Sequence, residues 1–324
     1  MSRGVNNDPL FDLLSYARPG PGRRDHLTPT QVHQVARTVG HAPEVMLKVL
    51  PRGANDPSAV RRHLDYIGRK GELDLETDDG EILRGARVGK DLVEDWDLDL
   101  DALRSRANLV SRPGSAPPRL VHKLIFSMPA GTPPDRLLRA VQNFCREEFA
   151  LKHRYALALH TDEPHPHVHV ALKAMSEQGE RLHIRKATLR YWRAELARHL
   201  RALGVSANAT QRYVRGETTP RKLDGIYRAS LRGDSTHMRE RVEAAARVLS
   251  GGSPRAEPGK AKLVDTRDKV RRAWGAISEI LVRDNQSELA EQVRKFAEQM
   301  PPPMTEREWL AVRLASRARV PKVR

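Results

Sequence analysis

The chain has 324 residues and carries 57 Lys and Arg against 41 Asp and Glu, a formal net charge of +16 at pH 7. Such a basic balance indicates a polyanionic partner, either nucleic acid or an anionic membrane surface. The single cysteine excludes an internal disulfide framework and a zinc site of several cysteines, and it fits a reducing cytoplasm. No run approaches the roughly 18 apolar residues of a membrane span, so we expect a soluble cytoplasmic protein without membrane insertion.

The first fifty residues indicate an arm followed by a strand. Gly, Pro, Asn and Arg are frequent at the start, which predicts a loose N-terminal arm over 1–43 with one short helix near 28–38. The apolar segment 44–51 predicts a strand that ends at its proline.

A short helix with a tyrosine near its end is predicted next. Asp56 or Asn55 suits the N-cap, Pro57 suits the first helical position, and Gly68 suits the far end. The helix is expected to have about three turns. Tyr66 then lies close to its C-terminus.

The rest of the first two thirds mixes helices and strands. An acidic segment near 72–100 and a linker-like Ser/Pro stretch come first. We then expect strands over 119–131, 155–160, 167–175 and 179–186, and helices over 132–150 and 187–204. This mixed order predicts an α+β domain over 44–215.

The remainder, 216–324, is predicted to be a mainly helical basic extension. Helix-like segments lie near 234–250 and 262–299, on either side of a linker near 251–260. The P-loop pattern GxxxxGK[ST] does not occur in the sequence, so no helicase motif is evident.

Four of the 13 histidines fall within ten residues, HTDEPHPHVH at 160–169. Strand alternation puts His167 and His169 on one face, and a short hairpin brings His160 onto the same face. Alanines on that face are expected to leave open space above the sheet. Three imidazoles then form a half-closed divalent-metal site with open positions for substrate or water. The alternative is a polar hairpin of ordinary core and surface histidines.

Two neighbours of these histidines have separate expected roles. Asp162 is placed to orient a ligand imidazole through a hydrogen bond, as acidic residues around metal sites commonly do. His165, in the Pro-rich turn, is expected to support the ligands from outside or to contact phosphate.

Basic residues surround Tyr66 and follow the histidine strand, where they can bind DNA phosphates. The candidates are Arg61, Arg62, Arg69, Lys70, Arg181, Arg185, Lys186 and Arg190. Trp192 is predicted to belong to the core. The alternative for Tyr66 is an ordinary aromatic residue of an amphipathic helix.

The segment HTDEPHPHVHVALK resembles the His-rich motif of conjugative relaxases in the HUH endonuclease superfamily, including plasmid mobilisation proteins and the T-DNA border nuclease. HLDYIGRKGELDLE (63–76) is similar to the nucleophile motif of that family, and FSMPAGT (126–132) to its central strand and turn. All three occur in the family's order. The resemblance implies a central antiparallel sheet of about five strands with flanking helices.

The same resemblance assigns roles to residues of this chain. It implies Tyr66 as the nucleophile, Asp162 as the supporting acidic residue, and His160, His167 and His169 as metal ligands. The metal is expected to be Mg²⁺ or Mn²⁺, with Zn²⁺ as a third choice.

The resemblance further implies a relaxase that nicks single-stranded DNA at an origin of transfer. Its intermediate is a 5′-phosphotyrosine, the strand can be rejoined, and the reaction initiates conjugative DNA transfer. Implied partners are accessory relaxosome proteins and a type IV coupling or secretion machinery, with which the protein is translocated alongside the strand. Three alternatives stay open: a rolling-circle replication initiator, a metallohydrolase that uses the histidines without Tyr66, and a DNA-binding protein with a structural metal.

Overall fold

The structure, a computed structural model, describes residues 11–17, 24–51, 54–110, 118–218, 236–249 and 257–318. The chain forms two compact units. One unit is continuous and comprises His41–Ala209, and the other combines Met1–Gly40 with Thr210–Arg324. We describe each unit by itself.

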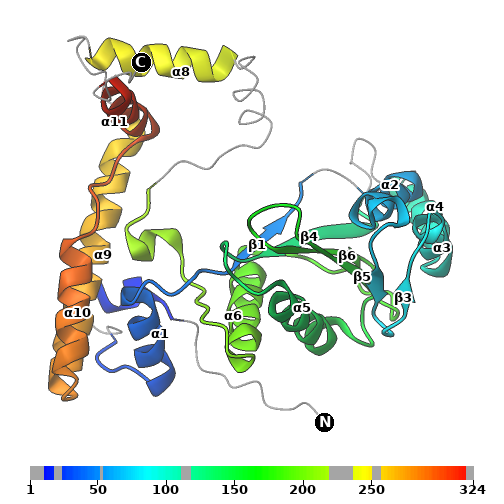
Figure 1. Ribbon diagram of the computed structural model, residues 1–324, viewed down its shortest axis with the longest axis horizontal. Coiled ribbons are helices and arrows are strands. Elements are labelled where there is room, and N and C mark those ends of the chain that lie inside the picture. The colour runs from blue at the N-terminus through cyan, green and yellow to red at the C-terminus, as the bar shows by residue number, and fades with distance from the viewer. Residues whose placement is uncertain are drawn as a thin grey trace. The chain divides into compact units, whose positions relative to one another are not determined.

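The unit His41–Ala209 is built on a six-stranded antiparallel sheet with the order β1-β4-β6-β5-β2-β3 (Figure 1). The strands are β1 (Met46–Val49), β2 (Leu75–Thr77), β3 (Ile82–Leu83), β4 (Val121–Ser127), β5 (Tyr155–His160) and β6 (His167–Lys173). The α+β class and the antiparallel sheet are therefore as predicted. The strand expected over 179–186 does not form, because this segment makes one isolated bridge, Met175 to Arg181, and then leads into a helix.

One face of the sheet is covered by the helices α5 (Pro134–Phe149) and α6 (Lys186–Ala202). Their apolar stripes pack on the inward side chains of β4, β5 and β6, with Phe144 at 1% exposure and Trp192 fully buried. Trp192 donates a hydrogen bond from its indole nitrogen to Glu148 at 2.9 Å. Trp192 thus belongs to the core, as predicted.

The opposite face is covered by α2 (Pro57–Ile67), α3 (Val88–Asp95) and α4 (Leu98–Val110). The predicted N-cap is present, since the Asp56 carboxylate accepts from the Ala59 amide at 2.8 Å. The alanines of β5 and β6 are buried beneath Val60 and Leu64 of α2. The prediction of open space above these alanines is therefore wrong. Their small side chains let α2 approach the sheet closely, and the helix occupies that space.

The acidic segment near 72–100 is part of the folded unit. It supplies β2, β3 and α3, and it buries Trp96 completely. Two of its carboxylates hold Arg154 of the sheet, Asp78 at 2.9 Å and Asp95 at 2.8 Å. Most of the predicted Ser/Pro linker that follows lies outside the described residues.

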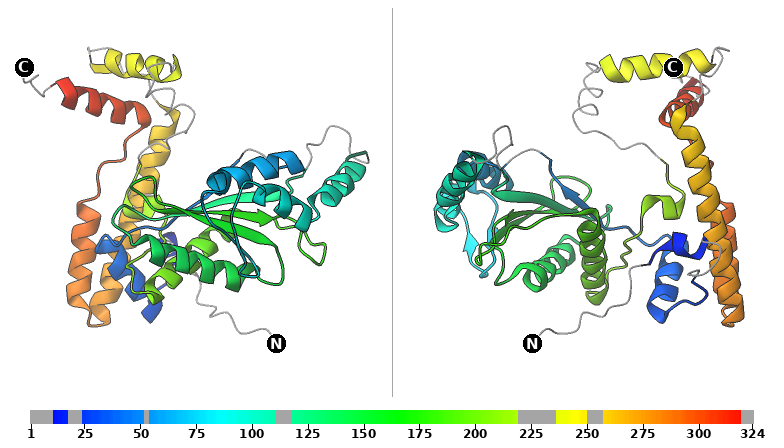
Figure 2. Two further views of the ribbon diagram at one scale, coloured as in Figure 1. Left: turned by 45° about the vertical axis from the view of Figure 1, so that its right-hand side comes forward. Right: turned by 180° about the vertical axis from the view of Figure 1, so that it is seen from behind.

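The second unit is helical (Figure 2). Its elements are η1 (Leu13–Ala17), α1 (Pro29–Val39), η3 (Arg212–Arg215), α8 (Thr236–Leu249), α9 (Pro258–Arg283), α10 (Ser287–Glu298) and α11 (Glu306–Ala318). The segment predicted over 262–299 is thus two helices, which pack against each other. Between them Asn285 adopts φ 59°, a left-handed conformation that ends α9.

The prediction of a loose arm over 1–43 is wrong for the residues of this segment that the structure describes. Leu13, Tyr16 and Val35 are buried against Trp274 of α9 in one apolar cluster. The many Gly and Pro residues among the first thirty predicted a loop, and the few apolar residues of this segment gave too short a pattern to indicate a packed element. The linker predicted near 251–260 lies largely outside the described residues, and α9 already begins at Pro258. Among the described helices, none is long and apolar enough to cross a membrane.

Candidate active site

The hairpin of β5 and β6 brings the three predicted histidines together. His160 lies opposite His167, and His169 lies two pairs further along, opposite Ala158 and on the same face of the sheet. One ring nitrogen from each histidine lies within 4.8 Å of the other two. His160 and His169 are buried and His167 is half-buried, so the cluster is open on one side only.

Backbone carbonyls fix two of the three rings. His160 Nε2 donates to the Ile67 carbonyl oxygen at 2.7 Å, and His167 Nδ1 donates to the His165 carbonyl oxygen at 3.1 Å. The other ring nitrogen of each residue, His160 Nδ1 and His167 Nε2, therefore carries a lone pair. This is how metal-binding histidines are usually oriented.

The buried rings are neutral at physiological pH. Burial lowers the pKa of His169 to about 3, with the neighbouring His160 and His167 acting in the same direction. Burial also lowers the pKa of His160 from its ordinary value. Neutral imidazole is the form that binds a metal, so the donor set fits a divalent cation held by three nitrogens.

Tyr66 lies in the last turn of α2 beside this cluster. Its ring centre is 6.0 Å from that of His169 and 6.5 Å from that of His160, while its side chain is 54% exposed. The hydroxyl-bearing residue is thus close to the imidazoles and accessible from solvent. The adjacent Asp65 pairs with Arg61 along the helix at 3.7 Å.

Arg69 follows in a reversed stretch of backbone, the short helix η2 (Arg69–Gly71). Arg69, Lys70 and Gly71 all have positive φ, of 50°, 56° and 95°. This rare run turns the chain back over the site, so that the Arg69 guanidinium lies 5.4 Å from the centre of the Tyr66 ring. Strained backbone of this kind gathers at functional sites.

Asp162 is bound by Arg69 rather than by a ligand imidazole. The guanidinium donates both to the Asp162 carboxylate and to His160 Nδ1, the latter at 3.3 Å. Asp162 therefore acts on His160 through Arg69, which differs from the direct hydrogen bond expected from the sequence. Arg69, expected to bind DNA, lies inside the site.

His165 joins the histidine turn to the end of β4. Its Nδ1 accepts a hydrogen bond from the Ala130 amide at 3.0 Å. It is outside the group of three converging ring nitrogens, and its supporting role stays a prediction.

The remaining basic candidates fall into two groups. Arg61, Arg62 and Lys70 are exposed on or just after α2, on the same side as the histidines. Arg185, Lys186 and Arg190 are exposed at the start of α6, which covers the opposite face of the sheet. Arg181 donates to the Arg119 carbonyl oxygen at 2.8 Å, near the beginning of β4 and about 20 Å along the strands from the histidine end.

Sequence reasoning missed His63. It is 5% exposed, and its ring centre is 6.4 Å from that of His169. The available signal was its position three residues before Tyr66, on the apolar face of the helix with Val60 and Leu64.

A second acid and histidine group lies on α5 and α6. Glu147, Glu195 and His199 also bring ligand atoms together. Arg198 donates to both carboxylates at 2.7 Å. The guanidinium compensates their charge, so we interpret this group as an ion-pair cluster.

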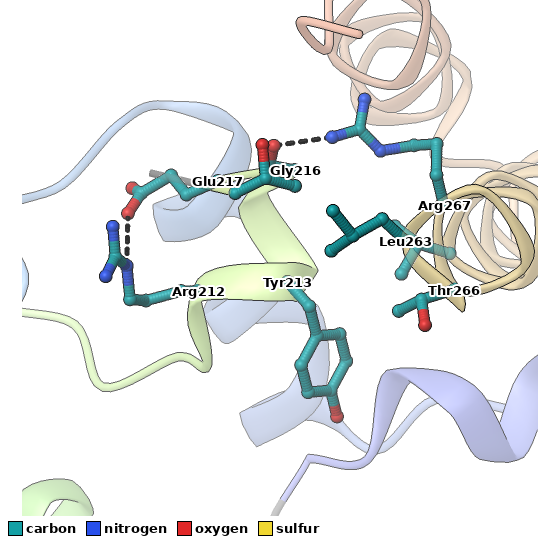
Figure 3. A pocket seen from close by; sticks show the side chains of 9 residues that line it. Arg212, Tyr213, Gly216, Glu217, Leu263, Thr266 and Arg267 are labelled. Carbon is teal, nitrogen blue, oxygen red and sulfur yellow. Dashed lines mark hydrogen bonds and ion pairs between the residues drawn. The ribbon is translucent and has the colours of Figure 1, made fainter. Parts of the chain in front are cut away.

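The helical unit contains a pocket of about 280 Å³ between residues 212–218 and α9 (Figure 3). Within it Arg212 pairs with Glu217 at 3.3 Å, and Arg267 donates to the Gly216 carbonyl oxygen at 2.5 Å. These charged side chains are already engaged inside the unit. None of the candidate site residues lines the pocket, and we assign no ligand to it.

One comparison with known proteins assigns part of the chain to a family. Residues 66–204 match the family model described as Relaxase: MobA/VirD2-like, nuclease domain. The match begins at Tyr66, includes the histidine hairpin and falls within the unit His41–Ala209. A search of curated proteins found no match to the chain.

Proposed function

Residues 66–204 form a nuclease domain of the MobA/VirD2-like relaxase family, and we propose that it cuts one DNA strand at an origin of transfer through a covalent 5′-phosphotyrosine. The observation that carries this proposal is the position of Tyr66, exposed and 6.0 Å in ring separation from His169 of the triad. A tyrosine that must reach a phosphodiester needs this combination of access and proximity.

In the proposed reaction, the Tyr66 hydroxyl oxygen attacks the scissile phosphorus. A bond forms between this oxygen and phosphorus, the bond from phosphorus to the 3′ oxygen breaks, and the tyrosine proton is lost as the 3′ hydroxyl gains one. The number of phosphoester bonds is unchanged, so the 3′ hydroxyl of a strand can attack the phosphotyrosine and rejoin the DNA. The reaction is a transesterification rather than a hydrolysis.

His160, His167 and His169 would hold the divalent cation. When bound, the cation supplies Lewis-acid polarisation of a phosphate oxygen. Nitrogen donors suit Mn²⁺ and Zn²⁺ better than Mg²⁺, whereas the family resemblance favours Mg²⁺ or Mn²⁺. Arg69 must give up its bond to His160 Nδ1 when that nitrogen binds a cation, because the nitrogen has one lone pair.

The charges near Tyr66 support a polyanionic substrate. Arg61, Arg62 and Lys70 are exposed on the same side as the histidines and can bind backbone phosphates.

We further propose that the protein acts in the cytoplasm with accessory relaxosome proteins. Transfer through a type IV machinery, with the protein carried on the strand, belongs to the same proposal.

The test is a denaturing gel of the full chain incubated with single-stranded DNA tiled across the regions flanking its own gene. We expect an SDS-resistant adduct with Mn²⁺ or Mg²⁺, absent with EDTA and absent in Tyr66→Phe. Tyr191→Phe is the matched control, because Tyr191 lies on α6 at the opposite face of the sheet.

Three outcomes would contradict the proposal. Metal-dependent cleavage that persists without an adduct in Tyr66→Phe indicates a metallohydrolase. Binding without cleavage of any tile indicates a DNA-binding protein. A nick that maps to a replication origin, rather than to a transfer origin, indicates a rolling-circle initiator.

A further inference from the structure

Two buried ring nitrogens beneath the histidine triad have no hydrogen-bond partner within the described part of the chain. They are His63 Nε2, on α2, and His169 Nδ1, on β6. Both residues are buried, at 5% and 3% exposure. Their rings neighbour each other, with centres 6.4 Å apart and planes inclined by 67°. A buried polar atom without a partner is rare in native proteins and needs an explanation.

The other two metal-ligand candidates, His160 and His167, each have a backbone partner that His169 Nδ1 lacks. His160 is held by the Ile67 carbonyl oxygen and His167 by the His165 carbonyl oxygen, each through one protonated ring nitrogen, which leaves the lone pair of the other nitrogen free to bind a cation. Within the residues that the structure describes, His169 Nδ1 has no such contact with a backbone carbonyl. The neighbouring ring of His63 carries the other unpaired buried nitrogen, Nε2.

We propose that His63 is a positioning residue for His169, acting through one water molecule held between His63 Nε2 and His169 Nδ1. A direct hydrogen bond between two imidazoles would require ring centres about 5 Å apart. The observed 6.4 Å exceeds this distance and leaves room for a bridging water. The site is polar at both ends, which a buried water requires.

The protons of this bridge determine which nitrogen of His169 faces the site. His169 donates its Nδ1 proton to the water, and the water donates to the lone pair of His63 Nε2. His63 then carries its own proton on Nδ1. His169 is left with a lone pair on Nε2, in the same way that His167 is left with one on its Nε2.

The inference rests on the proposed metal site, and its test is metal affinity rather than nicking. Titration calorimetry of the full chain with Mn²⁺ alone compares the wild type with His63→Leu. This substitution removes both ring nitrogens and leaves an apolar side chain of similar size. We expect an affinity 10- to 100-fold weaker, the usual effect of removing a residue that orients a ligand. His63→Gln, which keeps a polar atom near the position of Nε2, should return the affinity to within about threefold of the wild type.

Val60→Ala is the matched control, because Val60 lies on the same buried face of α2 and has no polar side-chain atom. It should lower the melting temperature and leave Mn²⁺ affinity unchanged. Wild-type affinity in His63→Leu, or an equal loss in Val60→Ala, would overturn the role of His63. If His169→Ala binds Mn²⁺ as the wild type does, the metal site itself fails and the inference fails with it.

A second measurement on the wild type covers the case in which His63→Leu does not fold. Long-range proton–nitrogen NMR correlations of the imidazoles report which nitrogen carries the proton. We expect His169 protonated on Nδ1 and His63 protonated on Nδ1. A proton on Nε2 of His169 would overturn the proposed bridge.

Discussion

Acid should destabilise the unit His41–Ala209 through His63, and the size of the effect follows from the burial of the His63 ring. Burial, together with the nearby Lys123 ammonium, lowers the pKa of His63 to about 3. In the unfolded chain the pKa returns to about 6.5. Above pH 6.5 the ring is neutral in both states, so no stability is lost there. Between pH 6.5 and 3 the unfolded chain binds a proton that the native chain does not, and unfolding becomes easier by about 1.4 kcal/mol per pH unit.

The variant His63→Leu isolates this contribution. From pH 7 to pH 5 the wild type should lose about 2 kcal/mol on account of His63, since about 1.5 units lie below the unfolded pKa. The leucine variant lacks this proton, so its stability relative to the wild type should rise by the same amount. Histidines away from this position contribute equally to both proteins and cancel, and the adjacent His169, with a pKa lowered to about 3, stays neutral in the native protein over this range.

The assay is urea unfolding at pH 7, 6 and 5 in EDTA, followed by tryptophan fluorescence. Trp96 and Trp192 are fully buried in the unit His41–Ala209, and a Trp274→Phe background in every protein removes the signal of the tryptophan buried in the helical unit. Val60→Ala should keep a constant offset from the wild type at all three pH values. If the His63→Leu and wild-type stabilities run parallel from pH 7 to pH 5, the buried neutral state assigned to His63 is refuted.

Three further predictions concern the surroundings of Tyr66. Gly71→Ala should lower stability by about 1–3 kcal/mol in a thermal melt, because φ is 95° and a Cβ would collide with the Gly85 backbone; an unchanged melting temperature contradicts this. Asp162→Asn should change stability by less than about 1 kcal/mol, since the carboxylate is exposed, yet it should slow adduct formation by releasing Arg69. An unaltered adduct time course counts against that role. Mn²⁺ at 100 times its Kd should stabilise the wild type by about 2.7 kcal/mol and leave His167→Ala unstabilised, as a thermal shift would record.

The histidine hairpin was predictable because its signal is local. Alternation along two short strands places His160, His167 and His169 on one face whatever the rest of the fold does. The N-cap at Asp56 is local in the same sense, because the capped amide lies three residues away. Such contacts depend on a few consecutive residues and survive any arrangement of the remaining chain.

The contacts that sequence reasoning missed join distant segments. The alanines of β5 and β6 predicted space for a ligand above the sheet, whereas α2 occupies that space. The alternation of side chains along a strand does not indicate which element covers each face. Nothing in the acidic residues near 72–100 indicates their partner, yet Asp78 and Asp95 bind Arg154 across 76 and 59 positions of sequence. His63 belongs with these cases, because its neighbour His169 is supplied by β6.

The end of α2 explains why the tyrosine and the histidines meet where they do. The last carbonyls of a helix have no partner within the helix. The Ile67 carbonyl oxygen is one of these, and it accepts from His160 Nε2 at 2.7 Å. The turn that offers this free carbonyl also carries Tyr66 on its exposed side, one residue earlier. One turn earlier in the helix, the backbone carbonyls are bonded to amides of the helix itself. A tyrosine placed there would not lie beside a carbonyl that is free to bind a histidine. The C-terminal turn of α2 thus orients a histidine of the cluster and presents the proposed nucleophile at the same time.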